Sequence, residues 1–172
     1  YVAAIDSNGN ALDWNPSPGN YVRALAASDD GTVIYMGGFF SAVGATSRAY
    51  LAAVNASTGA LTSWAPAANG IVLALTVSGG IVYAGGQFTT LGGVAHGYLG
   101  AVQESDGTVL AWNPAANGHV YTLTIDNGVL YVGGAFTSIS STTRNYAAAY
   151  LLSDSSLTSW NPNANSYVNS IV

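Results

Sequence analysis

The residues that could perform acid–base chemistry are few in this sequence. Its 172 residues include eight Asp and Glu, two His and no Cys, and the formal net charge is −5. Two carboxylates facing each other across a cleft could hydrolyse a glycosidic bond. Nearly all the acidic residues instead fall in or beside expected turns, namely Asp6, Asp29, Asp30, Glu104, Asp106, Asp126 and Asp154. Turn positions give no reason for two carboxylates to converge, so we predict no catalytic residue.

Candidate metal ligands are equally sparse. His96 and His119 show no HExxH or similar ligand spacing. The absence of Cys removes thiolate ligands and thiol nucleophiles. The stretch DSNGN at 6–10 resembles a calcium-binding loop in composition, but it lacks the terminal glutamate and lies where the other copies have plain hairpins. A turn is therefore the favoured interpretation, and we expect neither a metal nor a cofactor.

An internal repeat organises the whole chain. Trp14, Trp64, Trp112 and Trp160 recur at intervals of 50, 48 and 48 residues, each within a near-copy of one pattern. A fixed period of this length is typical of solenoids and β-propellers. We predict a single domain with complete repeats at about 15–64, 65–112 and 113–160, and partial repeats at 1–14 and 161–172.

Four short strands are expected in each repeat, because the hydrophobic period is two and Gly, Asn, Asp or Pro bounds each run. The first strands are predicted at 21–26, 71–77, 120–125 and 167–172, and the second at 33–38, 81–86 and 129–134. The third strands begin at Tyr50, Tyr98, Tyr146 and Tyr1, and the fourth end at the repeated tryptophan. No helical pattern survives ten residues. The prediction is an all-β chain whose blades of four antiparallel strands build a β-propeller.

Two sets of repeated residues allow a structural and a functional interpretation. The glycine pairs that end the second strands are Gly37 and Gly38, Gly85 and Gly86, and Gly133 and Gly134. Close backbone packing between blades is favoured for them, since a phosphate cradle would need a helix N-terminus that is not predicted. For the four tryptophans, packing between blades is favoured over a role as sugar-stacking platforms.

These motifs together resemble a known repeat family. The motifs are VYAGGQF at 82–88, RAYLAAV at 48–54, TGAL at 58–61, and WNP at 112–114 followed by NG at 117–118. They resemble the delta-60 type of bacterial and archaeal β-propeller repeats over essentially the whole chain, and more weakly the kelch repeats. The resemblance implies a propeller of a secreted or surface-attached protein, with no catalytic residue in the repeat.

Composition restricts the classes of partner. Charged residues make up 6% of the chain, against about 25% in typical soluble domains. There is no lysine, and the net negative charge argues against nucleic acid as a partner. No run of 18 apolar residues predicts a membrane span. The polar, lysine-free surface favours an extracellular or cell-surface location, and the sequon at Asn55 is a candidate glycosylation site.

The distribution of charge suggests an interaction face. In an up-and-down blade, the turns that carry the acids lie on one face. Arg48, His96 and Arg144, each two residues before a third-strand tyrosine, would lie on the opposite face as a candidate interaction surface. Opposite charges on two faces favour a head-to-tail contact between copies.

The function predicted from these features is a non-enzymatic structural or interaction scaffold. Residues 1–14 and 167–172 supply only part of one divided blade, and unpaired strand edges attract other strands. Partners would be other copies of the chain or other surface proteins, with glycans as a further class, and assembly would give a filament or a larger propeller. The alternative is a carbohydrate-binding or carbohydrate-active propeller whose catalytic residues lie outside this chain.

Overall fold

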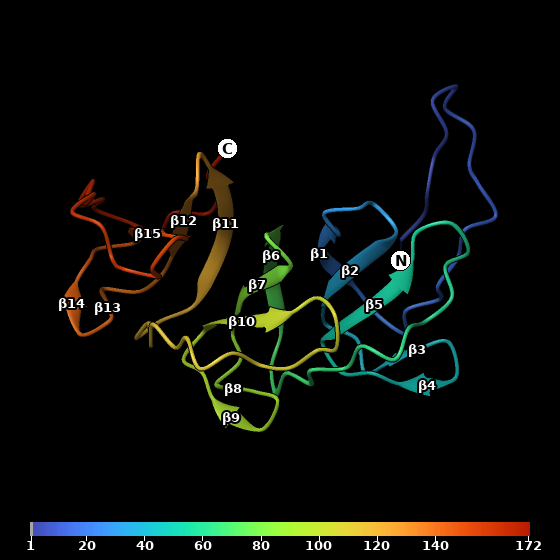
Figure 1. Ribbon diagram of the computed structural model, residues 1–172, viewed down its shortest axis with the longest axis horizontal. Coiled ribbons are helices and arrows are strands. Elements are labelled where there is room, and N and C mark those ends of the chain that lie inside the picture. The colour runs from blue at the N-terminus through green and yellow to red at the C-terminus, as the bar shows by residue number, and fades with distance from the viewer. Residues whose placement is uncertain (1) are drawn as a thin grey trace.

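Three blades stand side by side in the computed structural model, which describes residues 2–172 (Figure 1). The first blade contains β1 (Val22–Ala27), β2 (Val33–Gly38) and β5 (Leu51–Asn55). The second contains β6 (Val72–Ser78), β7 (Ile81–Gly86) and β10 (Leu99–Gln103). The third contains β11 (Val120–Asp126), β12 (Val129–Gly134) and β15 (Ala147–Leu151). The described residues form no helix, so the all-β prediction is confirmed. Tyr1, the expected start of one third strand, lies outside the described residues.

Each blade is an antiparallel sheet with its second strand in the middle. The inner strands β1, β6 and β11 lie next to one another in neighbouring blades. Apolar side chains of adjacent blades pack together between the sheets. The seam between the first two blades, for example, contains Tyr35, Trp64, Val72 and Phe88, all buried. The hydrophobic core is therefore a series of seams between blades.

Short hairpins that the sequence pattern did not predict interrupt the loops between the second and third strands. They are β3 (Ala42–Val43) with β4 (Thr46–Ser47), β8 (Thr90–Leu91) with β9 (Val94–Ala95), and β13 (Ser138–Ile139) with β14 (Thr142–Thr143). Single bridges Pro18↔Val43 and Ala68↔Leu91 join two of them to the segment that precedes an inner strand. A strand of two residues is too short to show an alternation of hydrophobic and polar residues, so the sequence pattern did not indicate these hairpins.

The boundaries of the third and fourth strands differ from those expected. Tyr50, Tyr98 and Tyr146 have left-handed φ values of 64°, 63° and 65°. A residue in that conformation cannot continue a ladder, so each third strand begins one residue later. The fourth segment of each blade makes one bridge, such as Val102↔Val109, and then leaves the sheet as its tryptophan turns into the seam.

The segment at 167–172, predicted as a strand, forms no ladder. It lies across the third blade through hydrogen bonds from Val168 N to Gly134 O (3.2 Å) and from Ile171 N to Thr122 Oγ1 (3.2 Å). Its position corresponds to that of β6 against the first blade and of β11 against the second. A ladder needs a second strand at its edge, and the described residues provide none there.

Candidate interaction surfaces

The glycine pairs lie where backbones approach closely. A Cβ on Gly37 would lie 2.6 Å from Val72 Cγ1 of the next blade, and one on Gly85 would lie 2.5 Å from Val120 Cγ1. The second glycine of each pair faces its own blade, where a Cβ on Gly86 would collide with the carbonyl oxygen of Ile71. Gly38 and Gly134 have the same surroundings as Gly86, and a Cβ on Gly133 would meet Val168 at 2.7 Å.

The repeated tryptophans lie in the seams between blades. Trp14 and Trp64 are 8% and 5% exposed. Their indole nitrogens donate to the carbonyl oxygens of Asn55 (3.2 Å) and Gln103 (2.8 Å), each at the end of the third strand of the following blade. Trp112 is half-buried and makes edge-to-face contacts with Tyr83 and Tyr150 at 5.6 and 5.4 Å between ring centroids.

Trp160 differs from these three, because the described residues do not cover it. It is 40% exposed and contacts Tyr131 of its own blade at 5.3 Å between ring centroids. A cavity of about 480 Å³ opens beside it, lined by Thr124, Ile125, Asp126, Tyr131, Trp160, Ile171 and Val172. This open seam has the tryptophan and tyrosine of the closed seams, and no following blade among residues 2–172 covers them.

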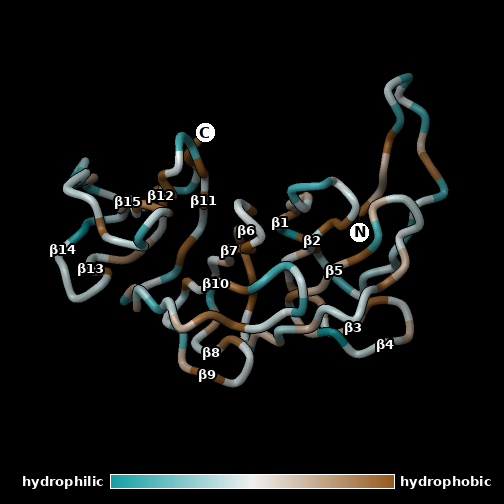
Figure 2. The backbone as a smooth tube through the Cα atoms, viewed as in Figure 1, coloured by the Kyte–Doolittle hydropathy of each residue, from teal (hydrophilic) through white to brown (hydrophobic). Residues whose placement is uncertain are grey.

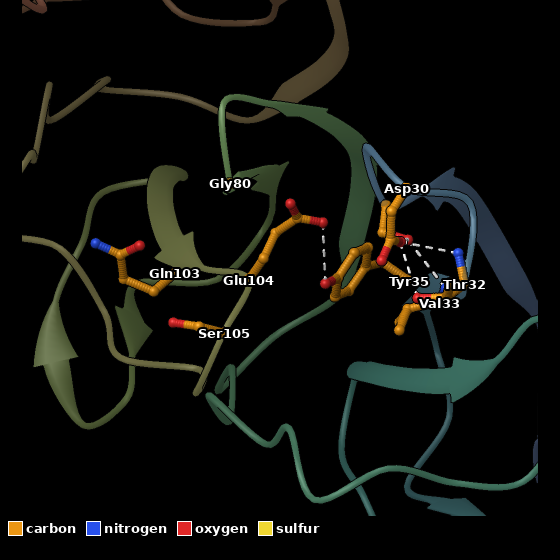
Figure 3. A pocket seen from close by; sticks show the side chains of 9 residues that line it. Asp30, Thr32, Val33, Tyr35, Gly80, Gln103, Glu104 and Ser105 are labelled. Atoms are coloured by element: carbon orange, nitrogen blue, oxygen red, sulfur yellow. Dashed lines mark hydrogen bonds between the residues drawn. The ribbon is translucent and has the colours of Figure 1, made fainter.

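A polar hollow of about 410 Å³ lies between the first two blades, where Tyr35 of β2 and Glu104, directly after β10, point toward each other (Figure 3). Tyr35 Oη donates a hydrogen bond to Glu104 Oε1 at 3.2 Å. Gly80 N, in the second blade, donates to Asp29 Oδ2 at 3.0 Å. These two bonds join the first blade to the second. Sequence reasoning missed the Tyr35–Glu104 pair because 69 residues separate its members.

The electrostatics of this hollow differ from one carboxyl group to the next. Partial burial, together with the nearby Asp29 and Asp30, raises the pKa of Glu104 above its usual value. Hydrogen bonds from Ser28 and Thr32 lower the pKa of Asp30 to about 2. Burial and the Glu104 charge raise the pKa of Tyr35, so its hydroxyl remains a donor at neutral pH. Among the described residues, no group of three His, Cys, Asp or Glu side chains is arranged to hold a metal ion.

The predicted cationic face has a different geometry from the one expected. Arg48 Nη2 donates to Thr62 O at 3.5 Å, and Arg144 Nη2 donates to Thr158 O at 2.9 Å. Each guanidinium thus ties a hairpin to the segment before the tryptophan of its own blade. Burial leaves the Nε atom of both arginines without a hydrogen-bond partner in the described part of the chain.

His96 does not contribute a charge to such a face. It is 1% exposed, and burial lowers its pKa, so the ring is neutral at pH 7. A Cβ on Gly100 would lie 3.1 Å from His96 Nδ1. Ala52 and Ala148 occupy the position of Gly100 in the arginine-bearing blades. The second blade therefore has a glycine where the imidazole needs the space of a methyl group.

The Asn55 side chain closes the turn after β5. Its Oδ1 atom accepts hydrogen bonds from Ser57 N (3.0 Å) and Thr58 N (2.9 Å). Glycosylation at this sequon stays a prediction. No helix among residues 2–172 is long and apolar enough to cross a membrane.

Comparisons with known proteins identify the architecture. The chain matches no protein-family model and no curated protein sequence. Among solved structures it is similar to U3-55K, with a TM-score of 0.64 and 11% identity over 91% of this chain and 44% of that one. It is also similar to the RRP9 WD40 repeats, with a TM-score of 0.58 and 11% identity over 85% of this chain and 40% of that one. For the Neurospora crassa Pan2 WD40 domain, the TM-score is 0.53 and the identity is 14%, over 80% of this chain and 38% of that one.

The chain therefore spans less than half the length of each of these three proteins. Identities this low show a shared fold alone, which is a β-propeller built of repeats. The expected repeat architecture is thereby confirmed, whereas the delta-60 or kelch type of the repeat is not shown.

Proposed function

We propose that this chain is a non-enzymatic scaffold whose open seam binds a further blade of the same repeat type. The observation that carries the proposal is the exposed Trp160 (40%), which lies beside a cavity of about 480 Å³, while the equivalent Trp64 (5%) is buried by the next blade. Burying an aromatic side chain of this kind is a principal source of association energy. The surface of the second blade that covers Trp64 indicates the shape and chemistry that a blade covering Trp160 would need.

The opposite end of the array offers the complementary surface. Residues 2–13 form a hairpin closed by the bridge Ile5↔Ala11, and Ile5 and Leu12 are 67% and 50% exposed. By the repeat alignment, the carbonyl of Asp6 occupies the position of Asn55 and Gln103, whose carbonyls accept the tryptophan indoles of closed seams. A blade of this type can therefore satisfy the indole of Trp160.

Docking of the first partial blade of one copy on the last blade of another is a heterologous contact, and such contacts propagate into filaments unless they close a ring. The same surfaces also fit a larger propeller in which further repeats belong to one polypeptide. The sparse charge and the resemblance to delta-60 repeats support a secreted or cell-surface setting, with other copies or other surface proteins as partners.

Sedimentation velocity and electron microscopy of the purified chain test this function, with Trp160→Ala as the variant. We expect concentration-dependent assembly that Trp160→Ala weakens at least tenfold, because the open seam loses its largest side chain. Discrete particles of one or two chains would exclude a filament. An intact-mass measurement on native material separates a longer single polypeptide from assembled copies.

A carbohydrate-binding propeller is the second candidate, and Trp160 with Tyr131 is also the observation that favours it. An exposed aromatic ring beside a cavity can stack on a sugar face. A glycan panel distinguishes the two candidates. Turnover of any glycan would refute the scaffold, whereas binding without turnover that Trp160→Ala abolishes would identify a lectin-like site.

A further inference from the structure

The first blade leaves uncovered a surface that the other two blades bury. Leu25 of β1 is 50% exposed, whereas Leu75 and Leu123, at the same repeat position, are 9% and 8% exposed. Ile34 of β2 is half-buried, whereas Val82 in its place in the second blade is fully buried. Because the three blades have the same strands, the difference arises from what precedes each blade.

In the closed seam between the first two blades, the second strand of the preceding blade covers this surface. A Cβ on Gly37 of β2 would lie 2.6 Å from Val72 Cγ1 and 3.3 Å from Leu75 Cδ1, so the β2 backbone lies directly on the second blade. Tyr35 of the same strand is buried and contacts Trp64 edge-to-face at 4.8 Å between ring centroids. A second strand and its tyrosine thus fill the space between the tryptophan and the next blade.

A hollow of about 270 Å³ lies at the same place before the first blade, and its lining includes Ala4, Trp14, Leu25, Ile34 and Ala56. Figure 2 shows β2, which borders this hollow, in brown, the colour of hydrophobic residues.

The repeat positions show what the hollow lacks. Trp14 and Ala56 hold the positions of Trp64 and Glu104, which both contact Tyr35 in the next seam. No tyrosine-bearing second strand precedes the first blade among residues 2–172.

The strand edge beside this hollow is also open. Leu12 N donates to Ala4 O at 2.9 Å, which turns the Ala4 backbone toward its hairpin partner. Since neighbouring residues of a strand direct their backbone groups to opposite sides, those of Ala3 and Ile5 face the other side. No hydrogen bond between residues 2–172 occupies that side. In the first blade the equivalent edge, that of β5, pairs with β2 along its whole length.

The repeat defines the segment that fits both features. The second strands read VIYMGG, IVYAGG and VLYVGG, and their tyrosines pair with third-strand alanines, as in Tyr35↔Ala53 and Tyr83↔Ala101. Ala4 holds this alanine position beside the hollow. A second copy has no such strand to offer, because β2, β7 and β12 are the central strands of their own sheets.

We propose that the hollow between residues 2–14 and the first blade is a strand-acceptor site for a separate protein. The bound segment is extended, follows the pattern apolar–apolar–Tyr–apolar–Gly–Gly, and pairs antiparallel with residues 2–5. Its tyrosine enters the hollow opposite Ala4, and its glycines let the backbone lie on Leu25. The inference rests on the scaffold function proposed above and names the partner of the N-terminal end. It uses no residue of the open seam at Trp160, so the two proposals can fail separately.

Titration of the isotope-labelled chain with the capped peptide NGVLYVGGA, the sequence of residues 127–135, tests the site. We expect saturable NMR shifts of the Ala3, Ile5 and Leu25 amides and of the Trp14 indole N–H. The peptide with Tyr131→Ala should bind about tenfold more weakly, because it leaves the hollow unfilled. Absence of saturation, equal binding of the two peptides, or shifts confined to the seam at Trp160 would overturn the proposal.

Two leucine variants form a matched pair for the chain itself. Leu25 and Leu12 are equally exposed (50%), so Leu25→Ser and Leu12→Ser both preserve the fold, but only Leu25 lines the hollow. Leu25→Ser should weaken peptide binding about threefold or more, and Leu12→Ser should bind like the parent. Equal affinity of the two variants would overturn the assignment. Trp160→Ala should leave the affinity unchanged even where it prevents assembly, which separates this site from the open seam.

The source of the segment is tested on native material by intact mass and the same titration. Native chains that bind the peptide support a separate partner. A longer native polypeptide that no longer binds it would show that its own strand fills the hollow, and this result would overturn the separate partner.

Discussion

Glu104 and Asp30 border the same hollow, yet their carboxyl pKa values move in opposite directions. The pKa of Glu104 is raised, so the folded state holds its proton more tightly than the unfolded state does. Its contribution to stability is therefore present below the unfolded pKa and is lost as pH rises through the folded pKa. Asp30, whose pKa is lowered to about 2, contributes stability above its unfolded value that is lost as pH falls toward 2.

The variant Glu104→Gln separates these effects. It keeps an oxygen acceptor for Tyr35 but cannot ionise, so its free energy of unfolding should exceed that of the parent at pH 7, with the difference vanishing near pH 4. Urea denaturation between pH 4 and pH 8 measures this. A parent and variant that differ equally at every pH would show that Glu104 acts by packing instead of charge.

The tryptophans provide a second test on single side chains. Trp112 contacts tyrosines of two blades, so Trp112→Ala should reduce the free energy of unfolding by about 3 to 5 kcal/mol, as large aromatic truncations in cores do. Trp160→Ala, at the open seam, is the matched control and should cost the isolated chain clearly less. Overlapping thermal melts of Trp112→Ala and the parent would refute the packing role.

Strands and seams depend on the glycines that end each second strand. In Gly85→Ala the new methyl group would lie 2.5 Å from Val120 Cγ1, and overpacking of this kind costs about 1 to 3 kcal/mol. Gly19→Ala is the control, because the nearest atom to its new methyl group is Ala42 O at 3.6 Å. Adding Val120→Ala to Gly85→Ala should restore part of the lost free energy of unfolding, because it removes the methyl group that the new Cβ would meet. Chemical denaturation of the four proteins measures the effect, and equal stability of the two glycine variants would contradict it.

Assembly of the whole molecule should depend on apolar seams more than on charge. The charge pattern of the sequence favoured a head-to-tail contact between a cationic and an acidic face, but His96 is neutral and both arginines bind carbonyls of their own blade. At 1 M salt the Debye length falls to about 3 Å. Sedimentation velocity should therefore show assembly that persists or strengthens between 0.1 and 1 M NaCl. Dissociation at high salt would instead support a head-to-tail contact held by opposite charges.

The local pattern was sufficient to predict the blades. Alternating hydrophobic residues, turn glycines and a repeated tryptophan are short-range properties, and they placed β2, β7 and β12 at their observed bounds. The same pattern did not indicate the two-residue hairpins, nor that the segment at 167–172 would have no partner strand. Left-handed tyrosines shifted the start of each third strand by one residue, because backbone conformation at a single position is not encoded in periodicity.

Contacts between distant segments required the folded chain. Tyr35 meets Glu104 across a seam, and a cavity of about 340 Å³ brings Val94 of a hairpin strand together with Leu110, which precedes the next tryptophan. Comparing repeat positions could have revealed the apolar exchanges at Val94 and Leu110, but not that they share one hollow. The period and the strands follow from local alternation along the chain. Burial, such as that of His96 or the exposure of Trp160, depends on which blade lies alongside, and only three-dimensional packing establishes it.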